Sequence, residues 1–147
     1  MLHLIKDIAD NFFSFIKDDP VRPHIPEQQR VGSNRDVFVF QDNSVAKAIT
    51  CVSYQHVIPE DEVDLFENTG QPEVAVFYTI WSYTPGAGSD LIFQSVNWIK
   101  ENRPEIKRFI TLSPPTDMAR KFHIKNGAIV LRENKNTVNY EYLLIDR

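Results

Sequence analysis

A nearly continuous apolar run, VAVFYTIW, occupies residues 74–81 and constrains the fold more than any other segment of this 147-residue chain. Alternating polarity is typical of a strand with one face in water, whereas an unbroken run of β-branched and aromatic residues is typical of a strand covered on both faces. The run therefore predicts a strand over residues 73–83 in the centre of a sheet, with other structure packed on each side of it.

Further strands and helices are indicated on both sides of this run. Five strands are predicted by β-branched and aromatic composition between polar turns, at residues 37–40, 46–54, 108–112, 128–131 and 138–145. Apolar residues at helical spacing predict one helix that follows residue 88 and ends near Asn102, and another that ends at Asn126-Gly127. Hairpins at both ends, with a β-α-β unit between them, predict an α+β fold with a mixed, mostly antiparallel sheet flanked by helices.

The first 35 residues have a different pattern from the rest of the chain. Residues 4–17 carry apolar side chains at helical spacing and predict an amphipathic helix that ends at Asp18-Asp19-Pro20. Prolines at positions 20, 23 and 26 then predict an irregular connector until about residue 31. We therefore expect a single domain over residues 1–147, with the helix and connector at 1–35 and a core at 36–147.

Composition argues against several classes of function. The net charge is −4 and the sequence pI is about 5.5, so the chain is not expected to bind nucleic acid. Cys51 is the single cysteine, which excludes an internal disulfide and favours a reducing, cytoplasmic location. The sequence has no apolar run of the roughly 18–20 residues that span a membrane, and acids interrupt the segment where a signal peptide would be apolar. His3, His24 and His56 lack ligand spacing, so no metal site is expected.

The central strand leads directly into a short loop with two glycines, Gly86 and Gly88, at the start of the next helix. Glycine allows positive φ and close approach of a ligand to the backbone, and the first N–H groups of a helix have no intrahelical partner. With the positive end of the helix dipole, these features predict a phosphate or pyrophosphate site. No P-loop lysine follows, and two glycines in this element order do not match a dinucleotide fold. A tight strand-to-helix turn that needs small residues explains the same pattern.

From about residue 36 to residue 145 the element order resembles that of the Gcn5-related N-acetyltransferase family. The family carries Arg/Gln-x-x-Gly-x-Gly/Ala after its fourth strand, and YTPGAG at residues 83–88 falls on this motif. A second signature in the last helix, Asn-x-x-Ala-x-x-x-Tyr-x-x-x-Gly-Phe, has the spacing of Thr116, Ala119, His123, Gly127 and Ala128. The chain departs from the two motifs at Tyr83, Thr116, His123 and Ala128. The resemblance implies this fold and a site for an acyl-coenzyme A.

The resemblance also implies roles for particular residues. In the family, the fourth and fifth strands splay apart and the pantetheine arm of coenzyme A enters between them. Backbone groups at Trp81, Ser82 and Tyr83 would then bind pantetheine. N–H groups of the following loop would bind the pyrophosphate, at Thr84, Gly86, Ala87, Gly88 and Ser89. His123 stands where the family often has a tyrosine that protonates the leaving thiolate, and a histidine can act as an acid near neutral pH. A helix histidine with no role is the alternative.

Four further features have both a functional and a structural interpretation. Glu73 could act as a base through a water molecule, or it could be a solvated strand end. Ser113 ends a short strand and is expected to face the cleft, although capping of the next helix explains it equally well. Cys51 is expected in the core. The acids of residues 57–67 are expected to form a solvated loop that could attract a cationic substrate.

The resemblance leaves three functions open. The first is transfer of an acetyl group from acetyl-coenzyme A to a primary amine, on a small molecule or a protein. The second is a non-catalytic acyl-coenzyme A-binding domain, because Tyr83, Thr116 and His123 depart from the family motifs. The third is another reaction of an acyl-coenzyme A, such as decarboxylation. No membrane or nucleic-acid partner is expected, and a homodimer is left open.

Overall fold

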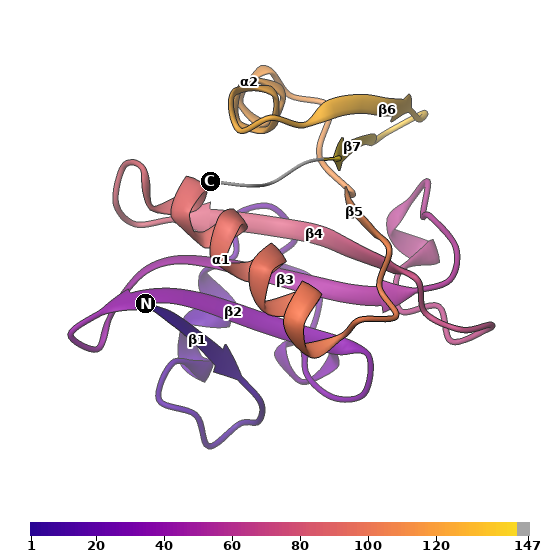
Figure 1. Ribbon diagram of the computed structural model, residues 1–147. Coiled ribbons are helices and arrows are strands. Elements are labelled where there is room, and N and C mark those ends of the chain that lie inside the picture. Colours follow the sequence, from indigo (N-terminus) through magenta and orange to yellow (C-terminus); the bar gives the residue numbers. More distant parts are fainter. Residues whose placement is uncertain (144–147) are drawn as a thin grey trace.

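One mixed sheet organises the computed structural model, which describes residues 1–143 (Figure 1). Within those residues its seven strands lie in the order β1-β2-β3-β4-β5-β7-β6. The strands are β1 (Leu2–Ile5), β2 (Arg35–Asp42), β3 (Val45–Gln55), β4 (Val74–Ser82), β5 (Arg108–Thr111), β6 (Ile129–Glu133) and β7 (Val138–Tyr142). β4 and β5 are parallel, and the other neighbouring pairs are antiparallel. The predicted mixed sheet is confirmed.

Helix α1 (Ala87–Asn102) connects β4 to β5 and lies across one face of the sheet, over β2 and β3 (Figure 1). Its apolar stripe is fully buried and consists of Leu91, Ile92, Val96 and Ile99. The helix begins directly after Gly86 and ends before Pro104, as glycine and proline signals predict. The second helix, α2 (Asp117–Lys125), joins β5 to the hairpin of β6 and β7. The two helices predicted after residue 88 and both predicted hairpins are therefore present.

The N-terminal segment covers the opposite face of the sheet. Its 3₁₀ helices span Phe13–Asp18 and Glu27–Arg30, and Ile16 and Ile25 pack against Val39 and Ile49 in the same buried cluster. Buried charges hold this segment down, because Arg30 donates to Asp19 at 2.6 Å and both side chains are almost fully buried. β4 is thus covered on both faces, which explains why its sequence is nearly all apolar.

The amphipathic helix predicted over residues 4–17 is wrong. Leu2–Ile5 instead forms β1, which pairs with β2 at the edge of the sheet. Beyond β1, the side chains of Asp7 and Asp10 accept bonds from the backbone N–H groups of Ala9 and Phe12, at 2.9 and 2.8 Å. Such local side-chain bonds compete with the N–H···O=C bonds of an α-helix, so only the short 3₁₀ helix forms.

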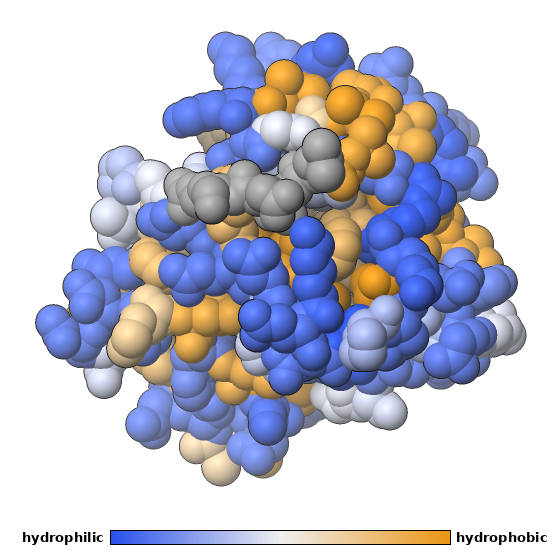
Figure 2. Space-filling view, viewed as in Figure 1, coloured by the Kyte–Doolittle hydropathy of each residue, from blue (hydrophilic) through white to orange (hydrophobic). Residues whose placement is uncertain are grey.

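β7 confirms the last predicted strand as far as Tyr142, and the predicted strand residues 144–145 lie outside the described residues. β6 lies at an edge of the sheet. Apolar surface gathers over α2 and β6, where Ile124 and Ile129 are exposed (Figure 2). Among residues 1–143, no helix is both long enough and apolar enough to cross a membrane.

A β-bulge interrupts the pairing of β4 with β3. Cys51 lies opposite Thr79 and Val52 lies opposite Phe77, so Tyr78 is an extra residue on β4. A bulge places two successive side chains on the same face of the sheet. Tyr78 and Thr79 accordingly both face the N-terminal segment, where the hydroxyl of Thr79 donates to Asp19 at 2.8 Å.

β4 and β5 separate at this bulge. Their parallel pairing ends with Phe77 and Thr111, followed by one more bond from the N–H of Leu112 to the carbonyl of Phe77, at 3.0 Å. β4 continues along β3 to Ser82, while the chain after β5 turns away toward α2. The two strands therefore form a fork, which we define as the space between residues 78–82 and residues 112–114.

Candidate active site

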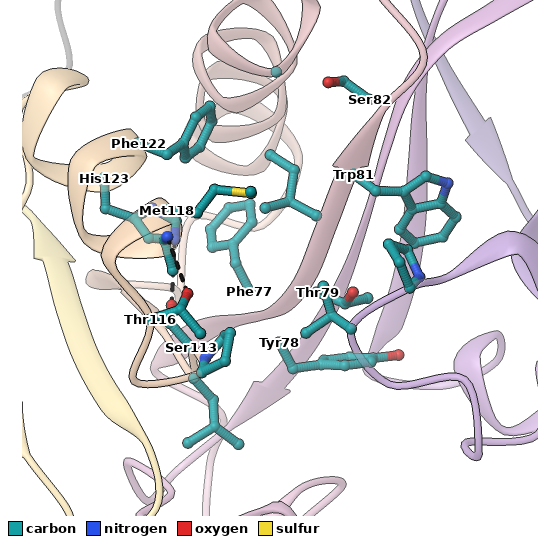
Figure 3. Close-up of a pocket in the computed structure, with 17 residues that line it drawn as sticks. Phe77, Tyr78, Thr79, Trp81, Ser82, Ser113, Thr116, Met118, Phe122 and His123 are labelled. Carbon is teal, nitrogen blue, oxygen red and sulfur yellow. Dashed lines mark hydrogen bonds between the residues drawn. The ribbon is translucent and has the colours of Figure 1, made fainter.

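A cavity of about 360 Å³ occupies the fork (Figure 3). One wall is β4, including Thr79 and Trp81, and the facing wall is the segment from Leu112 through α2, including Ser113 and His123 (Figure 3). Pro20 and Val21 of the N-terminal segment also line it. A cavity of this size is within the range of small-molecule sites. Among the described residues that line it, none is Asp, Glu, Lys or Arg.

His123 carries the polar chemistry of this cavity. Its Nε2 lies 3.2 Å from Oγ of Ser113, and its Nδ1 lies 2.7 Å from the hydroxyl of Tyr142 on β7. The ring also stacks on Tyr140 with centroids 5.0 Å apart. Contacts on both nitrogens and one ring face fix the orientation of the imidazole.

Burial keeps this imidazole neutral. The side chain is 3% exposed, and burial lowers the pKa of His123 to about 4. Burial also raises the pKa of Tyr142, so the phenol keeps its proton. The described residues offer the Tyr142 hydroxyl no other acceptor, which favours the tautomer in which Nδ1 accepts that proton. The ring proton of neutral His123 therefore sits on Nε2, directed toward Ser113.

Ser113 is held in place from its other side. Its Oγ donates to Oγ1 of Thr111 at 2.7 Å, and that same oxygen accepts from the backbone N–H of Tyr140 at 3.1 Å. Ser113 does not cap α2, since Thr116 does so by accepting from the N–H of Ala119 at 3.2 Å. The Nε2···Oγ distance is long for a hydrogen bond, so a ligand oxygen can replace Ser113 as the partner of Nε2.

The two loop glycines have different backbone conformations. Gly86 has φ +84° and precedes α1, which fits the positive φ predicted for a glycine there. Gly88 is helical, and a Cβ added to it would lie 3.0 Å from Cε1 of Phe122. Gly88 therefore allows α2 to approach the start of α1 closely, so the motif supports helix packing as well as an open helix N-terminus.

The predicted cofactor residues are divided between the cavity and its surroundings. Trp81, Ser82 and Gly88 line the cavity. Tyr83, Thr84, Gly86, Ala87 and Ser89 lie in or next to the loop at the start of α1, outside the cavity lining. The Tyr83 hydroxyl donates to Asp18 at 2.9 Å and accepts from Nε1 of Trp81 at 3.1 Å, so its side chain is turned toward the N-terminal segment.

Two other candidates are not at the site. Glu73 precedes β4, at the end of the strand away from the fork, and it is exposed. Cys51 is fully buried, and burial raises the pKa of its thiol to about 11, which fits the core role predicted for it. No group of three or more His, Cys, Asp or Glu residues within residues 1–143 is arranged to hold a metal ion.

Residues that the sequence did not indicate complete the site. Tyr142 and Thr111 support His123 and Ser113 from strands β7 and β5. Arg22 reaches the fork from the N-terminal segment and donates to the carbonyls of Tyr78 and Leu112. These partners are up to 90 residues apart in the chain, so no local sequence signal could have found them.

Solved structures resemble this chain, although no protein-family model matches it and no curated protein sequence matches it significantly. Malonyl-CoA decarboxylase from Agrobacterium vitis has a TM-score of 0.81 and 18% identity, over 98% of this chain and 60% of that one. The GNAT domain of S. lividans PAT has a TM-score of 0.66 and 13% identity, over 96% and 88% of the two chains. An acetyltransferase from Bacillus subtilis in complex with CoA has a TM-score of 0.67 and 8% identity, over 97% of each chain. The chain has the fold of the Gcn5-related N-acetyltransferases.

The Gcn5-related N-acetyltransferase fold accounts for the position of the fork. The resemblance predicted that the fourth and fifth strands separate, and β4 and β5 separate after Phe77 and Thr111. Structural similarity at sequence identities of 18% or less shows the fold alone, so the reaction has to be argued from the site. The chain also spans only 60% of the length of the Agrobacterium vitis decarboxylase.

Proposed function

We propose that this chain binds an acyl-coenzyme A in the fork and decarboxylates a malonyl-type thioester. The observation that carries the proposal is the buried, neutral pair of His123 and Ser113 at one wall of a cavity whose described lining has no charged acid or base. The pantetheine arm would pass between β4 and β5, beside Trp81 and Ser82. The start of α1 would bind the pyrophosphate through free backbone N–H groups at Gly88 and Ser89.

The cavity suits the loss of a carboxylate. An apolar surrounding disfavours a charged carboxylate relative to neutral CO₂, so burying the acyl group there lowers the barrier to its release. The bond between the carboxylate carbon and Cα breaks, and its electron pair becomes the enolate of the thioester. An N–H donor at the thioester oxygen stabilises the charge that develops. Nε2–H of His123 supplies that donor in the proposed reaction.

The enolate must then gain a proton at Cα. The Ser113 hydroxyl stands next to Nε2 of His123. In the proposed reaction it turns from Thr111 to Cα and donates this proton, and solvent restores it afterwards. The net reaction consumes one proton and converts the malonyl thioester into an acetyl thioester and CO₂. No second substrate is needed. The malonyl-CoA decarboxylase from Agrobacterium vitis, whose name states this reaction, supports the proposal through its fold.

Acetyl transfer to an amine is the second candidate. It is favoured by the position of His123, which has the spacing of the family tyrosine in the last-helix motif. This reaction requires a base for the ammonium proton. Nδ1 of His123 is occupied by the phenol of Tyr142, and Nε2 carries the ring proton, so the described lining offers no such base. We therefore rank decarboxylation first.

Two assays separate these functions. Purified protein is incubated with malonyl-coenzyme A, and acetyl-coenzyme A is quantified by liquid chromatography, with His123→Ala as the inactive control. We expect acetyl-coenzyme A from the wild type alone. In parallel, thiol release from acetyl-coenzyme A is followed with a panel of amines. Amine-dependent thiol release without decarboxylation would establish acetyl transfer instead, and binding of coenzyme A without either reaction would establish a non-catalytic binding domain.

A further inference from the structure

Arg22 joins the two strands of the fork at the point where they separate. Its Nε donates to the carbonyl of Tyr78 at 2.8 Å, and its Nη2 donates to the carbonyl of Leu112 at 3.0 Å. Tyr78 is the bulge residue of β4, and the N–H of Leu112 makes the last bond between β4 and β5. One planar guanidinium thus satisfies two backbone carbonyls that have lost their strand neighbours.

The rest of Arg22 is fixed as firmly as its guanidinium. Its backbone N–H donates to Asp19 at 3.0 Å, and its carbonyl accepts from Nη2 of Arg30 at 2.7 Å. Its remaining terminal nitrogen, Nη1, donates to Glu62 at 2.7 Å, and Glu62 also contacts His24. The residue is 8% exposed. Hydrogen bonds at its backbone and at all three guanidinium nitrogens therefore hold Arg22 in a single conformation.

The loop of residues 57–67 is tied to the same place. Glu62 belongs to this loop, and the β6–β7 hairpin holds its other end, because Asn139 donates to the carbonyl of Pro59 at 3.0 Å. The loop is therefore anchored at Pro59 and through Glu62, the partner of Arg22, while Glu60, Asp61 and Asp64 are exposed as predicted for a solvated loop.

We propose that Arg22 is a positioning residue that sets the separation of β4 and β5 and thereby the width of the passage for the pantetheine arm. Arg22 is outside the cavity lining, but Val21, Tyr78 and Leu112 line it, so the guanidinium fixes cavity walls through their backbones. The inference rests on the proposed acyl-coenzyme A site. Without the two donors, the carbonyls of Tyr78 and Leu112 would turn toward other partners and the passage would change its shape.

The test compares coenzyme A with 3′,5′-ADP, which has the nucleotide but no pantetheine arm. In Arg22→Met, calorimetry should show affinity for coenzyme A lower by about tenfold or more, since small misplacements of a site have effects of that order. Affinity for 3′,5′-ADP should stay within about twofold of the wild type, because the nucleotide would lie outside the fork. A purely structural role would lower both affinities equally, and that result, like an unchanged affinity for coenzyme A, would overturn the inference.

Arg108→Met is the matched control. Arg108 makes a two-bond ion pair with Glu141 on the same sheet, at 2.8 and 2.7 Å, but it does not line the cavity. Its loss should lower the melting temperature and leave coenzyme A affinity unchanged. If Arg22→Met does not fold, Arg22→Lys keeps the charge but cannot hold both carbonyls in a planar fork. Arg22→Lys should show a smaller loss of coenzyme A affinity, again with little change in 3′,5′-ADP affinity. Wild-type affinity for coenzyme A in Arg22→Lys would count against the inference.

Hydrogen exchange tests the fork without any ligand. Amides of residues 77–79 and 112–113 should exchange faster in Arg22→Met than in the wild type, while those in the centre of β2 should not change. Wild-type protein that binds neither coenzyme A nor 3′,5′-ADP would refute the proposed function. In that case unchanged exchange at these amides would also refute a role of Arg22 in holding the fork.

Discussion

The imidazole of His123 and the hydroxyl of Ser113 are ten residues apart in the chain and 3.2 Å apart in the structure, at Nε2 and Oγ. The two residues come from α2 and from the segment that precedes it, and each is fixed by a further hydroxyl group. Tyr142 holds His123 at Nδ1, and Thr111 holds Ser113. The four side chains thus form one hydrogen-bonded row, and its two middle members, His123 and Ser113, line the cavity in the fork.

Removal of the imidazole should abolish most of the activity. In His123→Ala, turnover of malonyl-coenzyme A should fall by roughly 10²-fold or more, the usual effect of losing a group that stabilises or transfers a proton. Affinity for coenzyme A, measured by calorimetry, should change much less because in the proposed complex the ring would contact only the acyl group. Wild-type turnover in the folded variant would show that His123 is a bystander.

The buried imidazole should also make stability depend on pH. The pKa of His123 is about 4 in the folded chain against about 6.5 when unfolded, so the unfolded state binds more protons between these values. Stability should therefore be complete above pH 6.5 and decrease as the pH falls to 4, by up to about 3 kcal/mol. Urea unfolding of the wild type and of His123→Asn across this pH range isolates the contribution of His123 to the free energy of unfolding. Parallel pH profiles for the two proteins would contradict the lowered pKa.

Tyr142→Phe should reduce turnover by about tenfold with little change in coenzyme A affinity, because the ring proton of His123 would no longer be confined to Nε2. Tyr54→Phe is the matched control, since its hydroxyl donates to Asp36 at 2.6 Å in another part of the sheet. That variant should lose stability and keep its turnover number. Equal effects of the two substitutions on turnover would mean that Tyr142 is only structural.

Gly88→Val should disturb both packing and binding. A Cβ at this position would lie 3.0 Å from the Phe122 ring, so Phe122 must move into the cavity or α2 must move away. Coenzyme A affinity should fall sharply, and the double variant Gly88→Ala/Phe122→Leu should recover part of it by relieving the contact. Gly86→Ala is the comparison, because it adds backbone strain without a steric contact. An alanine at φ +84° would be strained by about 1 kcal/mol, although nothing lies within 4 Å of its Cβ. Recovery is measured by calorimetry and thermal unfolding.

Tyr83→Phe should have little effect on coenzyme A. The Tyr83 side chain is 44% exposed and its hydroxyl bonds Asp18 and Trp81 rather than the open end of α1. We expect an affinity within about twofold of the wild type and a loss of stability of up to about 1 kcal/mol. A large loss of affinity at unchanged stability would make the hydroxyl a ligand of the cofactor.

The sheet and helices could be predicted because their signals are local. The apolar run of β4, the polar turns of the hairpins and the Gly86 and Asn126-Gly127 boundaries each specify their own element. The prediction of an N-terminal helix was wrong because apolar periodicity alone does not reveal the competing side-chain hydrogen bonds of Asp7 and Asp10.

The site was predictable only in part. The motif spacing indicated His123, but its neutral state depends on burial of the side chain, and its orientation depends on a tyrosine 19 residues later. The role of Arg22 depends on contacts with three segments that are distant from it in the chain, and no sequence pattern indicates these contacts. The sequence allows two roles for Ser113, and the structure excludes helix capping because Thr116 occupies that position.

The single extra residue at Tyr78 makes the length of β4, as well as its composition, a condition of the site. Because side chains alternate with every residue along a strand, deleting one position between Phe77 and Thr79 would return the strand to a regular ladder. Ile80 and Trp81 would keep their faces and their partners Thr50 and Ile49, but Arg22 would lose the Tyr78 carbonyl that it binds where β4 and β5 separate. A substitution within β4 changes one side chain of the cavity wall and keeps the bulge, whereas deletion of this one residue would remove the bulge itself.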